Sequence, residues 1–412
     1  MASKYEIGVY YFPNYHVDPR NEKIHGPGWT EWDLVRCATP RFPGHRQPRV
    51  PAWGYEDESD PAVMARKIDA AADHGVDVFL FDWYHYHDGP FLARGLDRGF
   101  LGAANNRRLK FALMWANHDW TDIHPAKSGG RLNRPALLHP GAVSREGFDR
   151  IVDHVIACYF RHPSYWLLDG CPYFSIYELH TLINGLGGIE AAADALASFR
   201  AKVRAAGFPG LHLNDVAWDL AILPGEQAVQ DPQRVLHALR FDSITSYVWI
   251  HHADLSDFPE TPYAHAMAGA VAHWEKTART FDLPYFPNVT MGWDSSPRTV
   301  QSDRFTNCGY PFMPMLSGNT PAAFREALVR ARAFLDGRLG VPKILTINAW
   351  NEWTEGSYLE PDTVHGLGYL EAIREVFGGG RGVDKYSSIA ASLQPRSSQP
   401  IPEDGFFDST CV

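Results

Sequence analysis

Two glutamates near the C-terminal end of the chain have the spacing needed for acid–base chemistry. Glu352 and Glu355 lie in the segment ILTINAWNEWTEGSYLEP, residues 344–361. If the chain turns helically there, their Cβ atoms lie about 5–6 Å apart. Two carboxyl groups this close push their pKa values apart, and such a pair can cleave a glycosidic bond. The alternative interpretation is two solvated glutamates on a surface turn.

The residues around the pair favour a binding cleft. Residues 344–347 are apolar or β-branched and predict a short buried strand. Amides, tryptophans and further carboxylates follow at once, and charged groups are costly to bury without partners. We therefore interpret Glu352 and Glu355 as catalytic. Substrate contacts are expected from Asn348, Trp350, Asn351, Trp353, Tyr358 and Glu360.

The rest of the chain alternates between strand-like and helix-like segments. Apolar runs predict eight strands over residues 6–12, 76–82, 110–115, 172–177, 211–216, 243–249, 284–291 and 343–349. Amphipathic helices are predicted over residues 61–74, 145–161, 189–206, 264–280 and 321–339. This pattern predicts an α/β fold, a single (β/α)8 TIM barrel with long βα loops. The alternative is a doubly wound open sheet, but no GxGxxG follows the first strand.

A barrel of this kind carries its catalytic residues at the C-terminal ends of the strands and in the loops that follow. In this chain those positions are rich in aromatic, histidine, amide and carboxylate side chains, whereas the N-terminal ends are plainer. Aromatic rings suit stacking on the apolar faces of sugars. Further substrate contacts are therefore expected from Tyr11, Tyr15, His16, Trp29, Asp82, Trp83, His85, Trp115, Asn117, Tyr177, Tyr247 and Trp293.

Three long loops could shape a substrate site. Residues 14–60 contain the sequence GPGWTEWD and are predicted to form a lid or a substrate wall, with disorder as the alternative. Residues 116–144 and 248–262 are similar candidates. Residues 1–377 are predicted to form one catalytic barrel. Residues 378–412, rich in Gly, Ser and Pro, are predicted to form a C-terminal tail that is extended or packed on the barrel.

Composition excludes several classes of partner. The net charge of −10 argues against a nucleic-acid partner. No apolar run approaches about 18 residues, so membrane insertion is not expected. Paired histidines such as His85 with His87 and His251 with His252 match no metal motif, and we expect no metal and no cofactor. Scattered cysteines and the lack of a signal-like start predict a cytoplasmic protein, and secretion would require a signal peptide that has been removed. The sequence does not predict an oligomeric state.

Three motifs resemble a known family. YYFPNYH, FLFDWYHY and AWNEWTEGSYLEPD look like the WbsX-type proteins of polysaccharide gene clusters, which are related to the endo-α-mannosidases of glycoside hydrolase family 99. The resemblance covers roughly residues 5–377 and implies a (β/α)8 barrel. It also implies that Glu352 removes the proton of the substrate 2-hydroxyl to form a 1,2-anhydro sugar. Glu355 would protonate the leaving oxygen and then activate water, with retention of configuration. Tyr11, Tyr15, Trp83 and Tyr247 would line sugar subsites.

The resemblance leaves alternative activities open. WbsX-type proteins are commonly labelled glycosyltransferases, yet this sequence has no DxD motif beside a nucleotide-binding half-domain. We therefore predict a retaining glycoside hydrolase that cleaves an α-linked oligo- or polysaccharide, with internal cleavage as one mode. The alternatives are a glycosyltransferase of surface-polysaccharide biosynthesis and a non-catalytic carbohydrate-binding barrel.

Overall fold

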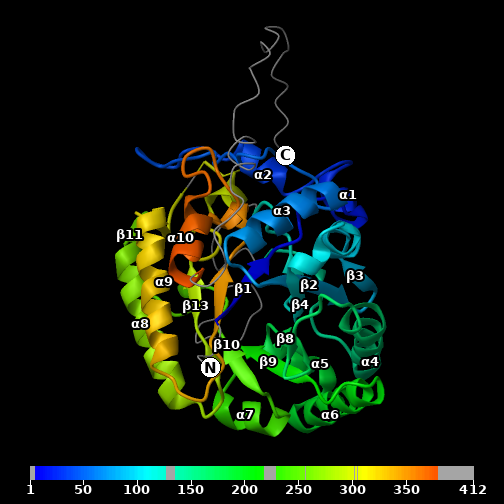
Figure 1. Ribbon diagram of the computed structural model, residues 1–412. Coiled ribbons are helices and arrows are strands. Elements are labelled where there is room, and N and C mark those ends of the chain that lie inside the picture. The colour runs from blue at the N-terminus through cyan, green and yellow to red at the C-terminus, as the bar shows by residue number, and fades with distance from the viewer. Residues whose placement is uncertain are drawn as a thin grey trace.

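The parallel strands of one sheet follow the predicted apolar runs (Figure 1). The computed structural model describes residues 5–126, 135–217, 229–255, 257–300, 302–303 and 305–378. The strands are β1 (Glu6–Tyr11), β2 (Val78–Tyr86), β4 (Lys110–Trp115), β8 (Cys171–Ile176), β9 (His212–Val216), β10 (Ser243–Thr245), β12 (Tyr285–Phe286), β13 (Asn288–Thr290) and β15 (Ile344–Asn348). Each lies within or close to a predicted run, because buried apolar and β-branched residues favour extended backbone.

The sheet closes through the seventh predicted strand. Pro287 divides that strand into β12 and β13, because proline has no N–H to give to the ladder. β12 pairs with β10, and β13 pairs with β15. β15 pairs in parallel with β1, so the first and last strands lie side by side. The predicted (β/α)8 barrel is confirmed, and the open doubly wound sheet is excluded by this strand order.

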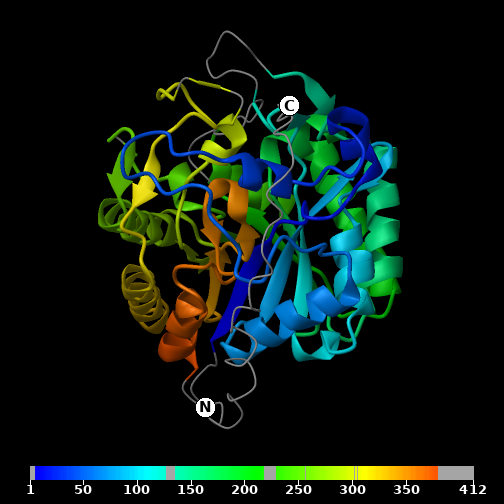
Figure 2. The same ribbon diagram turned by 90° about the horizontal axis from the view of Figure 1, so that it is seen from above.

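The helices surround the sheet (Figure 2). Five were predicted: α3 (Pro61–Asp73), α4 (Arg145–Val155), α6 (Ile189–Ala205), α8 (Tyr263–Thr280) and α9 (Pro321–Asp336). Asp60, Ser144 and Thr320 cap α3, α4 and α9, each accepting a hydrogen bond from a backbone N–H of the first turn. Proline occupies the first turn of α3 and α9, where a missing N–H has no cost.

The structure also contains elements that the sequence analysis did not predict. Helices α5 (Leu179–Leu186), α7 (Pro232–Leu239) and α10 (Gly368–Phe377) complete the outer layer. The predicted helix over residues 145–161 continues beyond α4 as the π-helical segment η3 (Ile156–Phe160). The short segments are β3 (Gly89–Phe91), β5 (Trp120–Thr121), β6 (Leu137–His139), β7 (Leu167–Leu168), β11 (Glu260–Pro262), β14 (Met315–Ser317), β16 (Asn351–Glu352), β17 (Ser357–Tyr358), η1 (Gly95–Phe100), η2 (Asn106–Arg108), η4 (Trp249–His251), η5 (Ser296–Thr299) and η6 (Trp353–Glu355).

The first loop is folded onto the C-terminal ends of the strands. It contains two short helices, α1 (Pro19–His25) and α2 (Trp32–Cys37), which lie at the top of Figure 1 with α3. The backbone N–H of Glu31 donates to the carbonyl of Asn14, and the indole of Trp32 donates to the carbonyl of Glu56. The loop was predicted to form a lid or a substrate wall, with disorder as the alternative. The structure shows an ordered loop.

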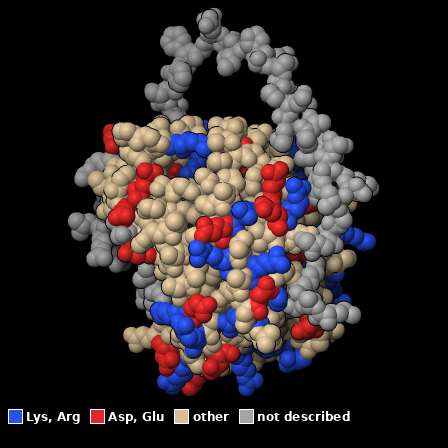
Figure 3. All heavy atoms as spheres, turned by 60° about the vertical axis from the view of Figure 1, so that its left-hand side comes forward, with Lys and Arg blue, Asp and Glu red and all other residues tan. Residues whose placement is uncertain are grey.

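The two ends of the described barrel meet at the opposite rim. Tyr5, just before β1, packs edge-on against Phe377, the last residue of α10, with ring centroids 5.3 Å apart. The predicted tail lies outside the described residues from 379 onward. Among the described residues, no helix is long and apolar enough to cross a membrane. Charged side chains of both signs are interspersed on the face shown in Figure 3.

A glycine in η1 gives a test of how tightly the first loop is packed. A Cβ at Gly99 would overlap the carbonyl oxygen of Glu58. Because overpacking costs about 1–3 kcal/mol, Gly99→Ala should lower the free energy of unfolding by that amount in urea denaturation. The matched control is Gly337→Ala, where the nearest atoms lie at 3.6 Å and the change should stay within about 0.5 kcal/mol. Equal effects of the two substitutions would contradict the packing described here.

Candidate active site

A cavity of about 560 Å³ opens at the C-terminal ends of the strands. Polar, aromatic and apolar side chains line it: Phe12, Asp82, Tyr84, Met114, Ala116, His118, Trp120, Ile123, His124, Tyr177, Tyr247, Val248, Ile250, His251, Trp293, Arg298, Tyr310, Glu352 and Glu355. The cavity therefore lies where a (β/α)8 barrel carries its active site. Six of the predicted residues line it: Asp82, Tyr177, Tyr247, Trp293, Glu352 and Glu355.

The two glutamates are brought together by a turn after the last strand. Glu352 ends β16, and Glu355 ends the single helical turn of η6. Gly356 then takes a positive φ of 63°, which lets the chain return antiparallel as β17. The predicted helical turn is present, and it directs both carboxyl groups into one cavity.

A buried arginine lies between the two carboxyl groups. Arg298, in η5, is 4% exposed. Its Nη1 donates to Glu355 Oε1 at 2.5 Å, and its Nη2 lies 3.3 Å from Glu352 Oε2. Nη2 also donates to Glu31 Oε1 at 2.9 Å. A buried guanidinium is tolerated only when it is well paired, and here three carboxylates supply the partners.

A tyrosine connects Glu352 to a third carboxyl group in the cavity. The hydroxyl of Tyr247 donates to Asp82 Oδ2 at 2.8 Å and lies 3.5 Å from Glu352 Oε1. Burial raises the pKa of Asp82 well above its usual range, although the hydrogen bond from Tyr247 acts in the opposite direction. Asp82 is therefore mostly protonated near neutral pH.

The pKa values of both glutamates are raised, chiefly by burial. For Glu352 the pKa rises well above the usual range, because the charge of Glu355 adds to the burial and Arg298 opposes it only in part. For Glu355 the pKa is raised less, since Arg298 and the hydrogen bond from Tyr310, at 2.7 Å, stabilise its charge. The shorter contact to Arg298 therefore favours the ionised form at Glu355 and the proton at Glu352, whereas the resemblance implied the opposite distribution.

Four predicted residues near β2 and β4 lie outside the cavity. Side chains alternate along a strand, so Asp82 and Tyr84 face the cavity while Trp83 and His85 face the helices. Trp83 packs against His154 and Tyr159. Trp115 packs on Phe148 and donates to the carbonyl of His85, and Asn117 bonds the backbone of Glu178. Trp83, His85, Trp115 and Asn117, which were predicted as substrate contacts, therefore do not line this cavity.

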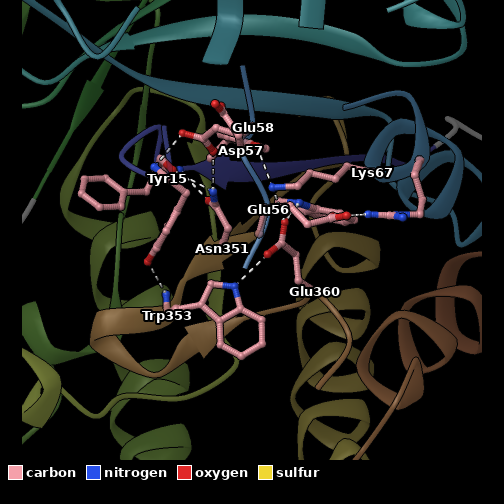
Figure 4. Close-up of polar contacts among 12 residues, drawn as sticks. Tyr15, Glu56, Asp57, Glu58, Lys67, Asn351, Trp353 and Glu360 are labelled. Carbon is pink, nitrogen blue, oxygen red and sulfur yellow. Dashed lines mark hydrogen bonds and ion pairs between the residues drawn. The ribbon is translucent and has the colours of Figure 1, made fainter. Parts of the chain in front are cut away.

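Most of the remaining predicted residues form a polar network behind the glutamates (Figure 4). Glu360 accepts from the indole N–H groups of Trp350, at 2.9 Å, and Trp353, at 2.7 Å. Its counter-ion is Lys67, in α3, whose Nζ lies 2.6 Å from Glu360 Oε1. Lys67 and Glu360 are both buried. Because Trp353 directly follows Glu352, this ion pair holds the backbone that carries a candidate catalytic group.

Glu58 holds the other side of the same segment. It accepts from the hydroxyl of Tyr11 and the backbone N–H of Tyr15, both at 2.9 Å, and contacts His16 Nδ1 at 3.1 Å. Asn351 Nδ2 lies 3.3 Å from Glu58. Asn351 also exchanges two hydrogen bonds with the backbone of Phe12, and the hydroxyl of Tyr15 accepts from the N–H of Trp353. Both neighbours of Glu352 are thus fixed by side chains from the first strand and its loop.

The predicted substrate contacts in this network do not line the cavity but hold the segment that carries the glutamates. They are Tyr11, Tyr15, His16, Trp350, Asn351, Trp353 and Glu360. Tyr358 bonds Asp362 at 3.0 Å and stacks on Trp353 at 3.7 Å. Trp29 stacks on His25. Asn348 is fully buried, and its amide has no hydrogen-bond partner among the described residues.

Several lining residues were missed by the sequence analysis. Arg298 and Tyr310 come from the loop after β13, at positions with no local pattern, whereas His118, Trp120 and His124 lie in the loop of residues 116–144 that the sequence analysis named as a candidate. Trp120 and His124 are stacked with their ring planes 4° apart. Glu31 had a signal, since it lies in GPGWTEWD, but that motif was interpreted as a substrate wall. Among the described residues, no group of three or more His, Cys, Asp or Glu side chains is arranged to hold a metal ion.

The fold is a (β/α)8 barrel with a polar and aromatic cavity at the C-terminal ends of its strands. A model of the family described as "Glycosyltransferase WbsX" matches residues 7–373, nearly the whole described barrel. The chain therefore belongs to the WbsX family.

Relatives with curated sequences carry no assigned activity. The uncharacterized protein WxcX from two strains of Xanthomonas campestris pv. campestris is 28% identical, over 89% of this chain and 49% of the relative. The chain thus spans about half the length of these relatives.

Solved structures of similar fold include glycoside hydrolases. The GH99 endo-alpha-mannosidase from Bacteroides thetaiotaomicron superposes with a TM-score of 0.53 at 13% identity, covering 90% of this chain and 96% of that one. A glycoside hydrolase-like protein gives a TM-score of 0.56 at 17% identity, covering 91% and 94%. At these identities the similarity shows the fold.

The Lys67–Glu360 pair gives a test of the supporting network. Lys67→Met leaves the carboxylate of Glu360 buried without a counter-ion, and we expect it to lower the free energy of unfolding by about 3–5 kcal/mol in chemical denaturation. The double variant K67M/E360Q removes both charges and should recover part of that loss. The control is Lys110→Met, whose ion pair with Glu6 is exposed and contributes about 1 kcal/mol or less. A loss for Lys67→Met no larger than for Lys110→Met would contradict the buried pairing.

Proposed function

We propose that this protein is a retaining glycoside hydrolase that cleaves an α-linked oligo- or polysaccharide with Glu352 and Glu355. The observation that carries the proposal is the pair of buried carboxyl groups facing one aromatic-lined cavity at the C-terminal ends of the strands. Rings such as Tyr84, Tyr177 and Trp293 suit the apolar faces of sugars. Carboxyl groups with raised and separated pKa values suit general acid–base catalysis near neutral pH.

The proposed reaction passes through a 1,2-anhydro sugar. Glu352 takes the proton of the 2-hydroxyl, whose oxygen then attacks the anomeric carbon. Glu355 gives its proton to the departing glycosidic oxygen and afterwards takes a proton from the water that attacks the anomeric carbon. As the anhydro ring opens, the C1–O2 bond breaks and Glu352 returns its proton to O2, so both glutamates regain their starting states and configuration is retained. The free site favours the proton on Glu352. Substrate binding must therefore move it to Glu355, against the stabilisation that Arg298 gives to the Glu355 carboxylate.

The name of a structural neighbour suggests where to begin. One protein of similar fold is an endo-alpha-mannosidase, so α-mannans are the first polymers to test and internal cleavage is the first mode to look for. The proposed partner is thus a carbohydrate chain. A glycosyltransferase activity is the second candidate, and the description of the family favours it.

The test is release of reducing ends from α-mannans and from bacterial and plant polysaccharides. Glu355→Gln should lower kcat by about 10²–10⁴-fold, because the amide cannot transfer a proton. Glu352→Gln should do the same by removing the base. Asp215→Asn is a matched control, since Asp215 is buried within the fifth strand, β9, but does not line the cavity.

Each outcome distinguishes between the candidate functions. Release that is lost in both Gln variants and kept in Asp215→Asn supports the hydrolase. Release that persists in Glu355→Gln would overturn the assignment of the catalytic pair. Turnover that requires an activated sugar donor, without release from any polymer, would instead favour the transferase. Sugar binding without turnover by either assay would identify a non-catalytic binding barrel.

A further inference from the structure

Arg298 is surrounded by groups that the proposed reaction uses. It contacts Glu355 at 2.5 Å and Glu352 at 3.3 Å, and its Nη1 also donates to the hydroxyl of Tyr310. It lies in η5, 54 residues before Glu352. The guanidinium is the cationic side chain that lies between the two candidate catalytic carboxyl groups.

The position of Arg298 is also fixed by a third glutamate, Glu31, which is not one of the candidate catalytic pair. Glu31 Oε1 accepts from its Nε at 3.1 Å and from its Nη2 at 2.9 Å. Glu31 is in turn bonded by Asn14 Nδ2, at 2.5 Å, and by the hydroxyl of Thr354. Since these contacts do not involve the catalytic carboxyl groups, the charge of Arg298 is held in place whichever of the two is protonated.

The two glutamates receive unequal shares of this charge. Glu355 Oε1 accepts a short, charge-assisted bond from Arg298 and a second bond from Tyr310. Among the described residues, the side chain of Glu352 has the longer contacts to Arg298 and Tyr247, at 3.3 and 3.5 Å. A short bond to a cation favours the ionised form more than a long one. The geometry therefore favours the ionised form at Glu355.

The other titratable groups near Arg298 do not offset this asymmetry. Burial lowers the pKa of His118 and of His124, so both are neutral at pH 7. Burial raises the pKa of each nearby tyrosine and of Asp82, which keeps them protonated. These groups are Tyr15, Asp82, Tyr84, Tyr247 and Tyr310. The guanidinium of Arg298 is therefore the charge that distinguishes Glu355 from Glu352.

We propose that Arg298 is a catalytic residue that holds the negative charge on Glu355, and that Glu31 is the positioning residue that keeps it there. The proposal rests on the proposed function only in naming the pair as catalytic. It predicts that the pair loses its first proton from Glu355. It also predicts that substrate binding must weaken the Arg298–Glu355 contact before Glu355 can act as an acid.

The experiment is a pH titration of the free enzyme labelled with ¹³C at the glutamate carboxyl carbon, with Glu352→Gln and Glu355→Gln used to assign the two resonances. In the unsubstituted protein Glu355 should titrate at lower pH than Glu352. Arg298→Met should raise the titration of Glu355 by about 1–3 pH units, because a nearby arginine lowers a carboxyl pKa by that amount. Arg298→Lys, which keeps the positive charge, should preserve most of the difference between the pKa values of Glu355 and Glu352.

Two further variants serve as controls. One covers the case in which Arg298→Met does not fold, and the other tests whether removing any arginine changes the glutamate titrations. R298M/E31Q removes the cation together with its partner, so it tests the same shift if Arg298→Met alone does not fold. Arg200→Met removes a partly buried arginine that pairs with Asp242 at 2.7 Å and does not line the cavity. It should leave both glutamate titrations unchanged.

The results separate this proposal from the proposed function, because the titration needs no substrate. Unshifted Glu355 titration in both Arg298→Met and R298M/E31Q would overturn the role of Arg298 even if the enzyme hydrolyses glycans. The predicted shift without any glycan turnover would support the charge assignment and count against the hydrolase. Where turnover is found, the acid limb of the kcat/KM profile should move to higher pH in Arg298→Met and not in Arg298→Lys.

Discussion

The contact between Arg298 and three carboxylates is the interaction on which the architecture of the cavity depends. A buried guanidinium is stable only with its donors paired, and its partners come from separate parts of the chain. Glu31 lies in the first loop, and Glu352 and Glu355 follow the last strand. The guanidinium of Arg298, in the loop after β13, thus pairs with carboxylates from both the beginning and the end of the barrel sequence. This contact also places four ionisable groups where their protonation states depend on one another.

Local patterns were sufficient to predict the barrel. Apolar runs of six to eight residues favour extended backbone wherever they are buried, and capping residues such as Asp60 and Thr320 mark helix starts within a few positions. The outer-layer helices that were missed are short: α5 and α7 span 8 residues each and α10 spans 10, which gives only a weak periodic signal. Closure through a strand divided at Pro287 depends on pairing across the sheet and has no signature in the sequence.

The candidate site could be predicted only in part, for two physical reasons. The density of polar and aromatic residues after β15 indicates a special region but does not distinguish the residues in the cavity from those that support it. Glu355 and Glu360 illustrate this, because one faces the cavity and the other pairs with Lys67 behind it. Contacts between distant positions are the second reason. Arg298 and Glu31 are separated by 267 residues, and no local pattern relates them.

The meeting of Tyr5 and Phe377 has a consequence for how this barrel can be handled. Both residues lie at the N-terminal ends of the strands, which is the end of the barrel opposite the cavity. A fusion partner, an affinity support or a surface tether joined at either of these positions would therefore leave the cavity mouth facing away from the attachment. A polymer too large to pass between the protein and its support would still reach the cavity, because the cavity opens at the end of the barrel that faces away from the support.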